Sequence, residues 1–417
     1  MINVYINYSS HGGNSWLSDV KIAKLWEKAF TCKEFWIDKP NPNEHNIAII
    51  KYDRTMQSAS DFPAEILNEI KWCLHNNIRI FLDDQWEQGQ PYVGRQTPLT
   101  LKHKDFFLKN NIKILTNFHS DYKNVNLGLE FEEGVDNLYV DCRNFFYVTR
   151  FMYDQWNIDT KQDTYHSRFK DKEYFYNCMI GDITKEKCIL LYGALAYNNL
   201  IDDDSIVTRV HMPNKNYRTI DMSNEPIINL VEDPNLVSYI DKNKTDIIKH
   251  DPYELRFNYQ YNNGNDEMNI IDERRIPQEM MNCYFSIVNE TIELPGFYTE
   301  KTFKHILAKL PFLIFGGPYD NKMFAEKHGF EMFDELFDYS FESIDYRYDD
   351  GKKANLQLVN GIVDNIKRLK KEPISIFNQP SLLEKIEYNY YLYMKNTRSS
   401  KYEEYLSEIF MEDKWQK

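Results

Sequence analysis

Short apolar stretches alternate with amphipathic ones along the first third of the chain. The apolar stretches are rich in β-branched and aromatic residues, which favour strands. They predict strands at residues 2–7, 46–52, 78–84, 112–118 and 137–142. Strands that alternate with helical patterns are typical of a parallel sheet covered on both faces.

The stretch 60–77, between the second and third predicted strands, has a helical period. Asp61 is expected to cap this helix, and Pro63 suits its first turn. The apolar side of the predicted helix is formed by Ile66, Ile70, Cys73 and Leu74. This pattern predicts a helix that packs one face on the sheet.

A second set of strands and helices follows in the other half of the chain. Strands are predicted at 174–182, 204–212, 284–290 and 311–317, and helices at 184–201, 300–310 and 355–371. The polar, aperiodic stretch between the two sets reads as a linker. We therefore predict an α/β protein with two Rossmann-like domains facing across a cleft.

The predicted domain boundaries follow from these patterns. The first domain spans 1–150, the linker 151–172, the second domain 173–380, and C-terminal helices that pack back on the first domain span 381–417. In open α/β sheets ligands bind beyond the carboxyl ends of the strands, so the expected site is the cleft between the domains.

Composition limits the class of protein. Hydrophobic residues make up 42% and charged residues 27%, which is typical of a globular chain. The net charge of −14 argues against a protein that coats nucleic acid by charge alone, although a local basic groove stays open. The start of the chain lacks the pattern of a signal peptide, and no segment approaches the roughly 18 apolar residues of a membrane span. We expect a soluble, cytoplasmic protein without membrane contact.

Cysteine usage agrees with a reducing compartment. None of the six cysteines forms a C-x-x-C pair, and their density is far below that of a disulfide scaffold. They are expected to be mostly buried small hydrophobes. The six are Cys32, Cys73, Cys142, Cys178, Cys188 and Cys283.

The stretch 297–318 carries the clearest chemistry. Thr299 is the expected N-cap of the helix 300–310, so Glu300 and Lys301 fall in its first turn. Free amides, the helix dipole, Lys301 and Lys304 suit a diphosphate, and Glu300 suits ribose hydroxyls. Gly316 and Gly317 end the next strand and permit close approach of a ligand. The alternative is a favourable first-turn charge pattern followed by an ordinary loop.

The segment 283–318 resembles the donor-binding region of α1,3-fucosyltransferase-like glycosyltransferases. The residues that carry the resemblance are Asn289, Glu290, Tyr298, Thr299, Glu300, Lys301, Pro311 and Gly316. Tyr298 and Thr299 have no spacer between them, and the order Asn-Glu leaves the role of Glu290 open. The stretch 174–195 is similar to that family's Asn-Cys segment, with Lys185 and Lys187 where the family presents a basic residue to the diphosphate. The pattern also resembles uncharacterised glycosyltransferase-like proteins of tailed phages.

The resemblance implies the two-domain arrangement called GT-B. It implies that the second domain binds a nucleotide-diphosphate sugar and that the first binds an acceptor. The donor-binding residues would be Lys187, Asn289, Glu290, Tyr298, Thr299, Glu300, Lys301, Lys304, Gly316 and Gly317. It also implies direct displacement with inversion and no obligatory cofactor or metal.

Inverting transfer needs a base for the acceptor hydroxyl. Asp83, Asp84 and Glu87 lie at the end of a predicted strand, where the cleft is expected. His11 precedes two glycines after the first strand and is the alternative. Asp202 and Asp204 form a D-x-D pattern that suits Mg²⁺ or Mn²⁺, but the pair falls in a natural loop, so a metal is not expected.

The acceptor is left open by the sequence. One candidate is a hydroxymethylated base of phage DNA, which would place the protein in the host cytoplasm; a glycan or a protein is the other. The alternative to an enzyme is a non-catalytic glycosyltransferase-like scaffold that binds a nucleotide or a protein. A nucleotide hydrolase lacks support, because no G-x-x-x-x-G-K-[ST] loop occurs.

Overall fold

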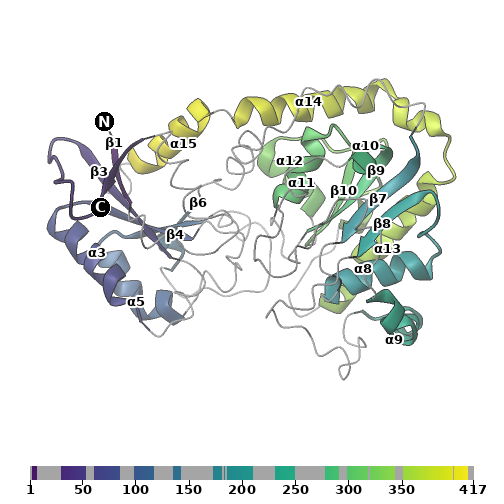
Figure 1. Cartoon of the computed structure of the whole chain (residues 1–417), viewed down its shortest axis with the longest axis horizontal. Helices are drawn as coiled ribbons and strands as arrows, with labels where there is room; N and C mark the ends of the chain where they lie inside the picture. The colour runs from purple at the N-terminus through teal and green to yellow at the C-terminus, as the bar shows by residue number, and fades with distance from the viewer. Residues whose placement is uncertain are drawn as a thin grey trace, which may run out of the picture. The chain divides into compact units, whose positions relative to one another are not determined.

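The computed structural model divides the chain into two compact units, which are described separately below (Figure 1). Unit 1 comprises Met1–Asn124, Leu129–Met152 and Met394–Lys417, and unit 2 comprises Val125–Gly128 and Tyr153–Tyr393. Within these units the structure describes residues 2–6, 30–52, 61–84, 98–116, 135–141, 172–180, 183, 186–209, 231–248, 278–290, 298–317, 320–342, 351–397 and 399–411.

Unit 1 contains a six-stranded parallel sheet with the order β2-β1-β3-β4-β5-β6. The strands are β1 (Ile2–Ile6), β2 (Thr31–Glu34), β3 (His45–Lys51), β4 (Arg79–Asp84), β5 (Lys113–Thr116) and β6 (Tyr139–Asp141). The five predicted strands of this half are confirmed. The sequence prediction missed β2, a four-residue edge strand with exposed ends.

The helices of unit 1 are α3 (Ala64–His75), α5 (Pro98–Lys109), α15 (Ser399–Met411) and the 3₁₀ turn η1 (Val135–Leu138). Helix α3 lies where the pattern predicts it and buries Ile66, Ile70 and Cys73. The predicted cap is wrong: Pro63 is the N-cap and no side chain caps the helix. The carboxylate of Asp61 instead accepts the amide of Phe62 and forms an ion pair with Lys102 on α5.

The last helix of the chain packs on the sheet of unit 1. The Phe410 ring lies 5.0 Å from that of Phe81 and 5.5 Å from that of Phe30. Arg79, the first residue of β4, donates from Nη1 to the carbonyl of Phe410 at 2.6 Å. Helix α15 therefore belongs to the core of unit 1 although it is the most distant in sequence.

Unit 2 contains a four-stranded parallel sheet with the order β10-β9-β7-β8. The strands are β7 (Tyr174–Ile180), β8 (Ser205–Arg209), β9 (Cys283–Asn289) and β10 (Phe312–Phe315). The helices are α8 (Glu186–Tyr197), α9 (Pro234–Ile247), α10 (Gln278–Met281), α11 (Glu300–Leu307), α12 (Asp320–His328), α13 (Gly351–Leu369) and α14 (Pro380–Asn396), with the 3₁₀ turns η5 (Ser340–Glu342) and η7 (Ile374–Asn378). The strands and helices predicted for this half are confirmed, so the chain is mixed α/β with parallel sheets.

The strand order of unit 2 creates a switch point between β7 and β9. Helix α8 connects β7 to β8 on one side of this central pair, and α11 connects β9 to β10 on the other. Right-handed crossovers that leave in opposite directions place their helices on opposite faces of a sheet, as Figure 1 shows for α8 and α11. The carboxyl ends of β7 and β9 are therefore the position where ligands of such sheets usually bind.

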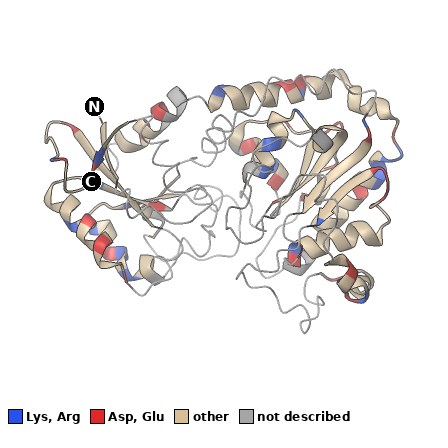
Figure 2. Cartoon of the chain, in the orientation of Figure 1, with Lys and Arg blue, Asp and Glu red and all other residues tan. Residues whose placement is uncertain are grey.

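Charge is dispersed over the described surface. Figure 2 shows acidic and basic residues interspersed along the helices of each unit. Among the helices that the structure describes, none is both long and apolar enough to cross a membrane. Of the five cysteines within the described ranges, four are buried, as predicted.

Candidate functional site

Glu290 organises the carboxyl end of β9. Its side chain is 1% exposed. Its carboxylate accepts the backbone N–H of Thr299 at 2.9 Å, the Thr299 hydroxyl at 2.7 Å and the Thr302 hydroxyl at 2.5 Å. Three donors to one carboxylate satisfy the hydrogen-bonding capacity of this buried group. Glu290 therefore fixes the first turn of α11 to the sheet.

The N-terminus of α11 is capped as the sequence predicts. The Thr299 hydroxyl accepts the amide of Lys301 at 3.3 Å, and Thr299 has the extended backbone of an N-cap. Since the Glu290 carboxylate lies at the same helix end, it offsets part of the positive potential there. A bound anion would therefore depend on lysine side chains as well as on the helix amides.

Lys187 connects α8 to the carboxyl end of β9. Its Nζ donates to the carbonyl of Glu290 at 3.0 Å and lies 4.9 Å from the centre of the Phe315 ring. The amide of Glu290 in turn donates to the carbonyl of Phe315 at 3.0 Å. The buried Lys187 thus joins α8, β9 and β10, which is a structural role beside any contact with a ligand.

Two buried amide oxygens lie along the central strands. Asn289 donates from Nδ2 to Sγ of Cys188 at 3.2 Å, and Asn177 donates to Oγ of Ser286 at 2.7 Å. The Oδ1 atoms of both asparagines are buried without a hydrogen-bond partner. Such orphan acceptors are costly unless water or a ligand donates to them. Asn289 is the last residue of β9 and so lies at the ligand end of the strand.

The Gly316–Gly317 turn is filled by a side chain of the protein. A Cβ atom on Gly316 would lie 1.8 Å from Oδ2 of Asp320. The same carboxylate accepts the amide of Gly317, and the Tyr298 hydroxyl donates to the carbonyl of Asp320 at 2.9 Å. The close approach expected for a ligand at Gly316 is thus made by Asp320, and Tyr298 links this turn to α11.

The remaining donor candidates lie on α11. Glu300 is its first residue, and its side chain lies outside what the structure describes. Lys301 is half-buried, and Lys304 is buried one turn later. His305 donates from Nδ1 to the carbonyl of Lys301 at 2.6 Å, and burial lowers its pKa to about 3. The neutral His305 therefore anchors the turn that carries Lys301.

The base candidates belong to unit 1. Asp83 and Asp84 are the last residues of β4, and Asp83 is 3% exposed. The side chain of Asp84, and all of Glu87 and His11, lie outside the described residues.

The D-x-D pair lies at the opposite edge of the second sheet from the Glu290 cluster. It precedes β8, so it lies at the amino ends of the parallel strands. Asp202 forms an ion pair with Lys370, the residue that follows α13. Within the described residues, no group of three or more His, Cys, Asp or Glu side chains is arranged to hold a metal ion.

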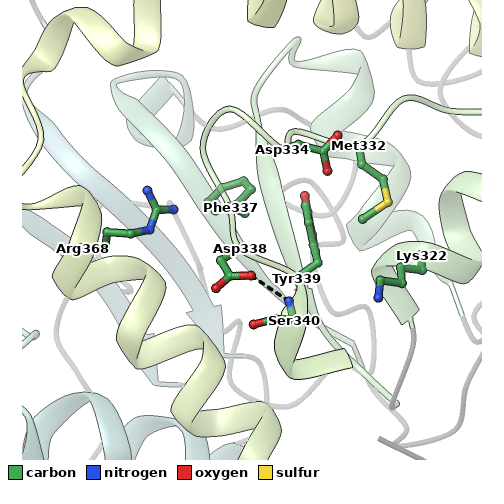
Figure 3. Close-up of a pocket in the computed structure, with 8 residues that line it drawn as sticks. All are labelled: Lys322, Met332, Asp334, Phe337, Asp338, Tyr339, Ser340 and Arg368. Atoms are coloured by element: carbon green, nitrogen blue, oxygen red, sulfur yellow. Dashed lines mark hydrogen bonds between the residues drawn. The ribbon is translucent and has the colours of Figure 1, made fainter. Parts of the chain in front are cut away.

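A separate surface pocket of about 490 Å³ lies between α12 and α13 (Figure 3). It is lined by Lys322, Met332, Asp334, Phe337, Asp338, Tyr339, Ser340 and Arg368. The amide of Ser340 donates to Asp338 at 2.8 Å, which lowers the pKa of that carboxyl. No candidate residue from the sequence lines this pocket.

Two residues at the site were missed by the sequence analysis. Thr302 contributes a buried hydroxyl to Glu290, and Asp320 fills the glycine turn. Thr302 is the third residue after the N-cap Thr299, a position from which a side chain can form hydrogen bonds near the N-cap. The spacing of the two threonines could therefore have indicated this role. Asp320 follows Gly-Gly-Pro-Tyr, a turn pattern that often precedes a helix.

No family model and no curated protein sequence matches the chain. Among solved structures, an α1,3-fucosyltransferase is 10% identical over 91% of each chain with a TM-score of 0.29. An α1,3-fucosyltransferase with GDP is 8% identical over 91% of each chain with a TM-score of 0.28. At this level of similarity, neither the fold of the whole chain nor its activity follows from the two structures.

Proposed function

We propose that the chain is a glycosyltransferase that moves a sugar from a nucleotide-diphosphate donor to an acceptor hydroxyl. The observation that carries the proposal is the buried cluster at the carboxyl ends of β9 and β10. There Glu290 and its hydrogen bonds to Thr299 and Thr302 hold the first turn of α11 in place. A cluster built from buried side chains supports ligand-contacting groups with little reorganisation.

The donor would bind at the first turn of α11. Lys301 and Lys304, with the positive end of the helix dipole, would stabilise the diphosphate. Glu300 would accept hydrogen bonds from ribose hydroxyls. Asn289 offers the buried Oδ1 atom as a further acceptor for a ligand hydroxyl or N–H. In this proposal Lys187, Glu290, Tyr298, Thr299, Gly316 and Gly317 act chiefly by positioning.

The reaction would be an inverting displacement of the GT-B type, in which unit 2 binds the donor and unit 1 binds the acceptor. The acceptor oxygen attacks the anomeric carbon as the bond from that carbon to the phosphate oxygen breaks. The nucleoside diphosphate leaves with its charge stabilised by the lysines. A base from unit 1, chosen from Asp83, Asp84, Glu87 and His11, takes the acceptor proton. The acceptor is a hydroxymethylated base of phage DNA, or else a glycan or a protein.

A transfer assay tests the proposal with matched lysine variants. Purified protein is incubated with UDP-, GDP-, ADP- and CMP-sugars and an acceptor panel, and release of free nucleotide is measured. Lys301→Ala and Glu300→Ala should lower turnover more than tenfold. Lys322→Ala, a half-buried lysine on α12 in the separate pocket, is the control and should retain turnover.

The outcomes separate the enzyme from its alternative. Turnover that falls in both α11 variants but not in the control supports the proposal. Turnover within twofold of the wild type in both variants contradicts the assignment of the donor site. Nucleotide binding without turnover on any acceptor would favour a non-catalytic scaffold.

A further inference from the structure

The turn after β2 exposes two large apolar side chains. Trp36 is 50% exposed and Ile37 is 71% exposed. They are adjacent in sequence and are followed by Asp38, whose amide donates to the carbonyl of Glu34 at 3.2 Å. Exposed apolar residues that lie singly are ordinary, but a tryptophan and an isoleucine together on one tight turn form a local contact surface.

The backbone of this turn is held in an unfavourable conformation. Trp36 has a φ of 64°, in the left-handed region that bulky residues rarely adopt. Asp38 fixes the turn, because its Oδ2 accepts the amide of Glu34 at 2.9 Å. Phe35, the residue before Trp36, holds the turn to the core: the centre of its ring lies 6.3 Å from that of Tyr5 and 5.5 Å from that of Trp72. Strain that the surroundings enforce is a recognised mark of functional positions.

The turn lies at the ligand edge of the first sheet. β2 runs parallel to β1, and Glu34 pairs with Ile6, so both strands end at the carboxyl edge. The order β2-β1-β3 places the switch point of this sheet between β1 and β3, one strand away. Ligands of open parallel sheets bind at this edge. Trp36 therefore flanks the position where an acceptor of unit 1 is expected.

The charges around the turn favour a neutral ligand. Glu34 and Asp38 each lie two residues from Trp36, and Lys33 and Lys39 each lie three residues from it, so the four charges of this segment balance. A segment without excess positive charge gives a polyanion such as DNA no electrostatic attraction. The carboxylates can accept hydrogen bonds from the hydroxyl groups of a neutral ligand, and the exposed indole face can pack against the C–H face of a sugar ring.

We infer that Trp36 and Ile37 form a binding platform for the pyranose ring of a neutral glycan, the acceptor of unit 1. The inference rests on the proposed glycosyltransferase function for the meaning of "acceptor", but glycan binding itself requires no donor. Trp36 supplies the stacking face, Ile37 extends it, and Asp38 holds the turn in the displayed conformation.

The test measures glycan binding without donor, using ¹⁵N-tryptophan-labelled full-length protein. The probes are maltohexaose, isomaltohexaose, cellohexaose, chitohexaose and a 12-nucleotide single-stranded DNA. The indole signal of Trp36, assigned by its loss in Trp36→Phe, should shift with at least one saccharide. Trp36→Gly should weaken that binding at least tenfold without lowering the melting temperature, because glycine tolerates the positive φ. Trp36→Tyr should restore most of the affinity.

Tyr391→Ala, at a 58% exposed aromatic residue on α14, is the control and should leave binding unchanged. A Trp36 signal that no saccharide moves, or that only DNA moves, overturns the inference. Unchanged saccharide affinity in Trp36→Gly also overturns it. Nucleotide-sugar binding by the same protein is measured in parallel and should be unaffected by Trp36→Gly. If the wild type binds no nucleotide sugar, the proposed function is contradicted, while the saccharide titrations still decide whether Trp36 binds a glycan.

Discussion

Replacement of Glu290 by alanine should destabilise unit 2 more than any other single change at the candidate site. The carboxylate accepts hydrogen bonds from one backbone N–H and two hydroxyls, all contributed by the buried residues Thr299 and Thr302. Each hydrogen bond to a charged acceptor contributes about 1.5–3 kcal/mol, and the donors would remain buried. A water molecule that enters the vacated space can recover part of this loss. The expected net cost is about 3–5 kcal/mol in the free energy of unfolding.

Two milder variants grade the effect. Glu290→Gln retains one acceptor oxygen and the shape of the side chain, so it should cost about 1–2 kcal/mol. Thr302→Val replaces the hydroxyl with a methyl group of similar volume and should cost about 1–2 kcal/mol. Because the two residues share one hydrogen-bond cluster, Glu290→Ala combined with Thr302→Val should cost less than the sum of the single variants.

Urea unfolding and native-state hydrogen exchange of the α11 amides measure these costs. Exchange is informative because it reports the local stability of α11 even where the two units unfold separately. Glu384→Ala, at an exposed carboxylate on α14, is the control and should change stability by less than about 0.5 kcal/mol. A loss below about 1 kcal/mol in Glu290→Ala, or strictly additive double-variant costs, would refute the reasoning.

Three further predictions concern other buried groups. Burial lowers the pKa of His305 to about 3, so between about pH 6.5 and that value a proton binds this histidine in the unfolded state but not in the folded state. The wild type should therefore lose about 2 kcal/mol of unfolding free energy between pH 7 and pH 5 relative to His305→Gln. Urea unfolding of both proteins at the two pH values measures this difference. Equal pH dependence in both proteins would contradict this. Gly316→Ala should cost about 1–3 kcal/mol, because its Cβ would collide with Asp320, and a melting temperature equal to that of the wild type would exclude the collision. Phe410→Ala should destabilise unit 1 by about 3–5 kcal/mol through lost contact with Phe81, and unchanged hydrogen exchange in β4 would disprove the packing role of α15.

The sequence predicted the strands of both sheets well because most of them are buried apolar runs. β9, for instance, is buried at all seven positions, so its apolar signal is continuous. β2 was missed because its residues Thr-Cys-Lys-Glu carry no such signal, and only pairing with β1 makes it a strand. The order of strands, and hence the switch point, is a tertiary property that local patterns do not encode.

The local features of the candidate site could be predicted from the sequence, but its hydrogen bonds between residues distant in sequence could not. The Thr299 cap depends on neighbours in sequence, and it was predicted correctly. The role of Glu290 depends on hydroxyls nine and twelve residues away that fold back over it. Likewise, Gly316 looked available to a ligand until Asp320 was found in that space. Lys187 was predicted as a phosphate contact, but its position over Phe315 could not be read from spacing.

A thermal-shift screen with nucleotide sugars tests whether the first turn of α11 binds a donor. Wild type, Lys301→Ala and the control Lys322→Ala are each heated with UDP-, GDP-, ADP- and CMP-sugars, with and without Mg²⁺. A ligand at about 100 times its Kd that binds only the folded state adds about 2.7 kcal/mol. We expect a clear rise in melting temperature with one nucleotide class, retained in Lys322→Ala and lost or strongly reduced in Lys301→Ala. No rise with any nucleotide sugar, or an equal rise in Lys301→Ala, would contradict the assignment of a donor site to the first turn of α11.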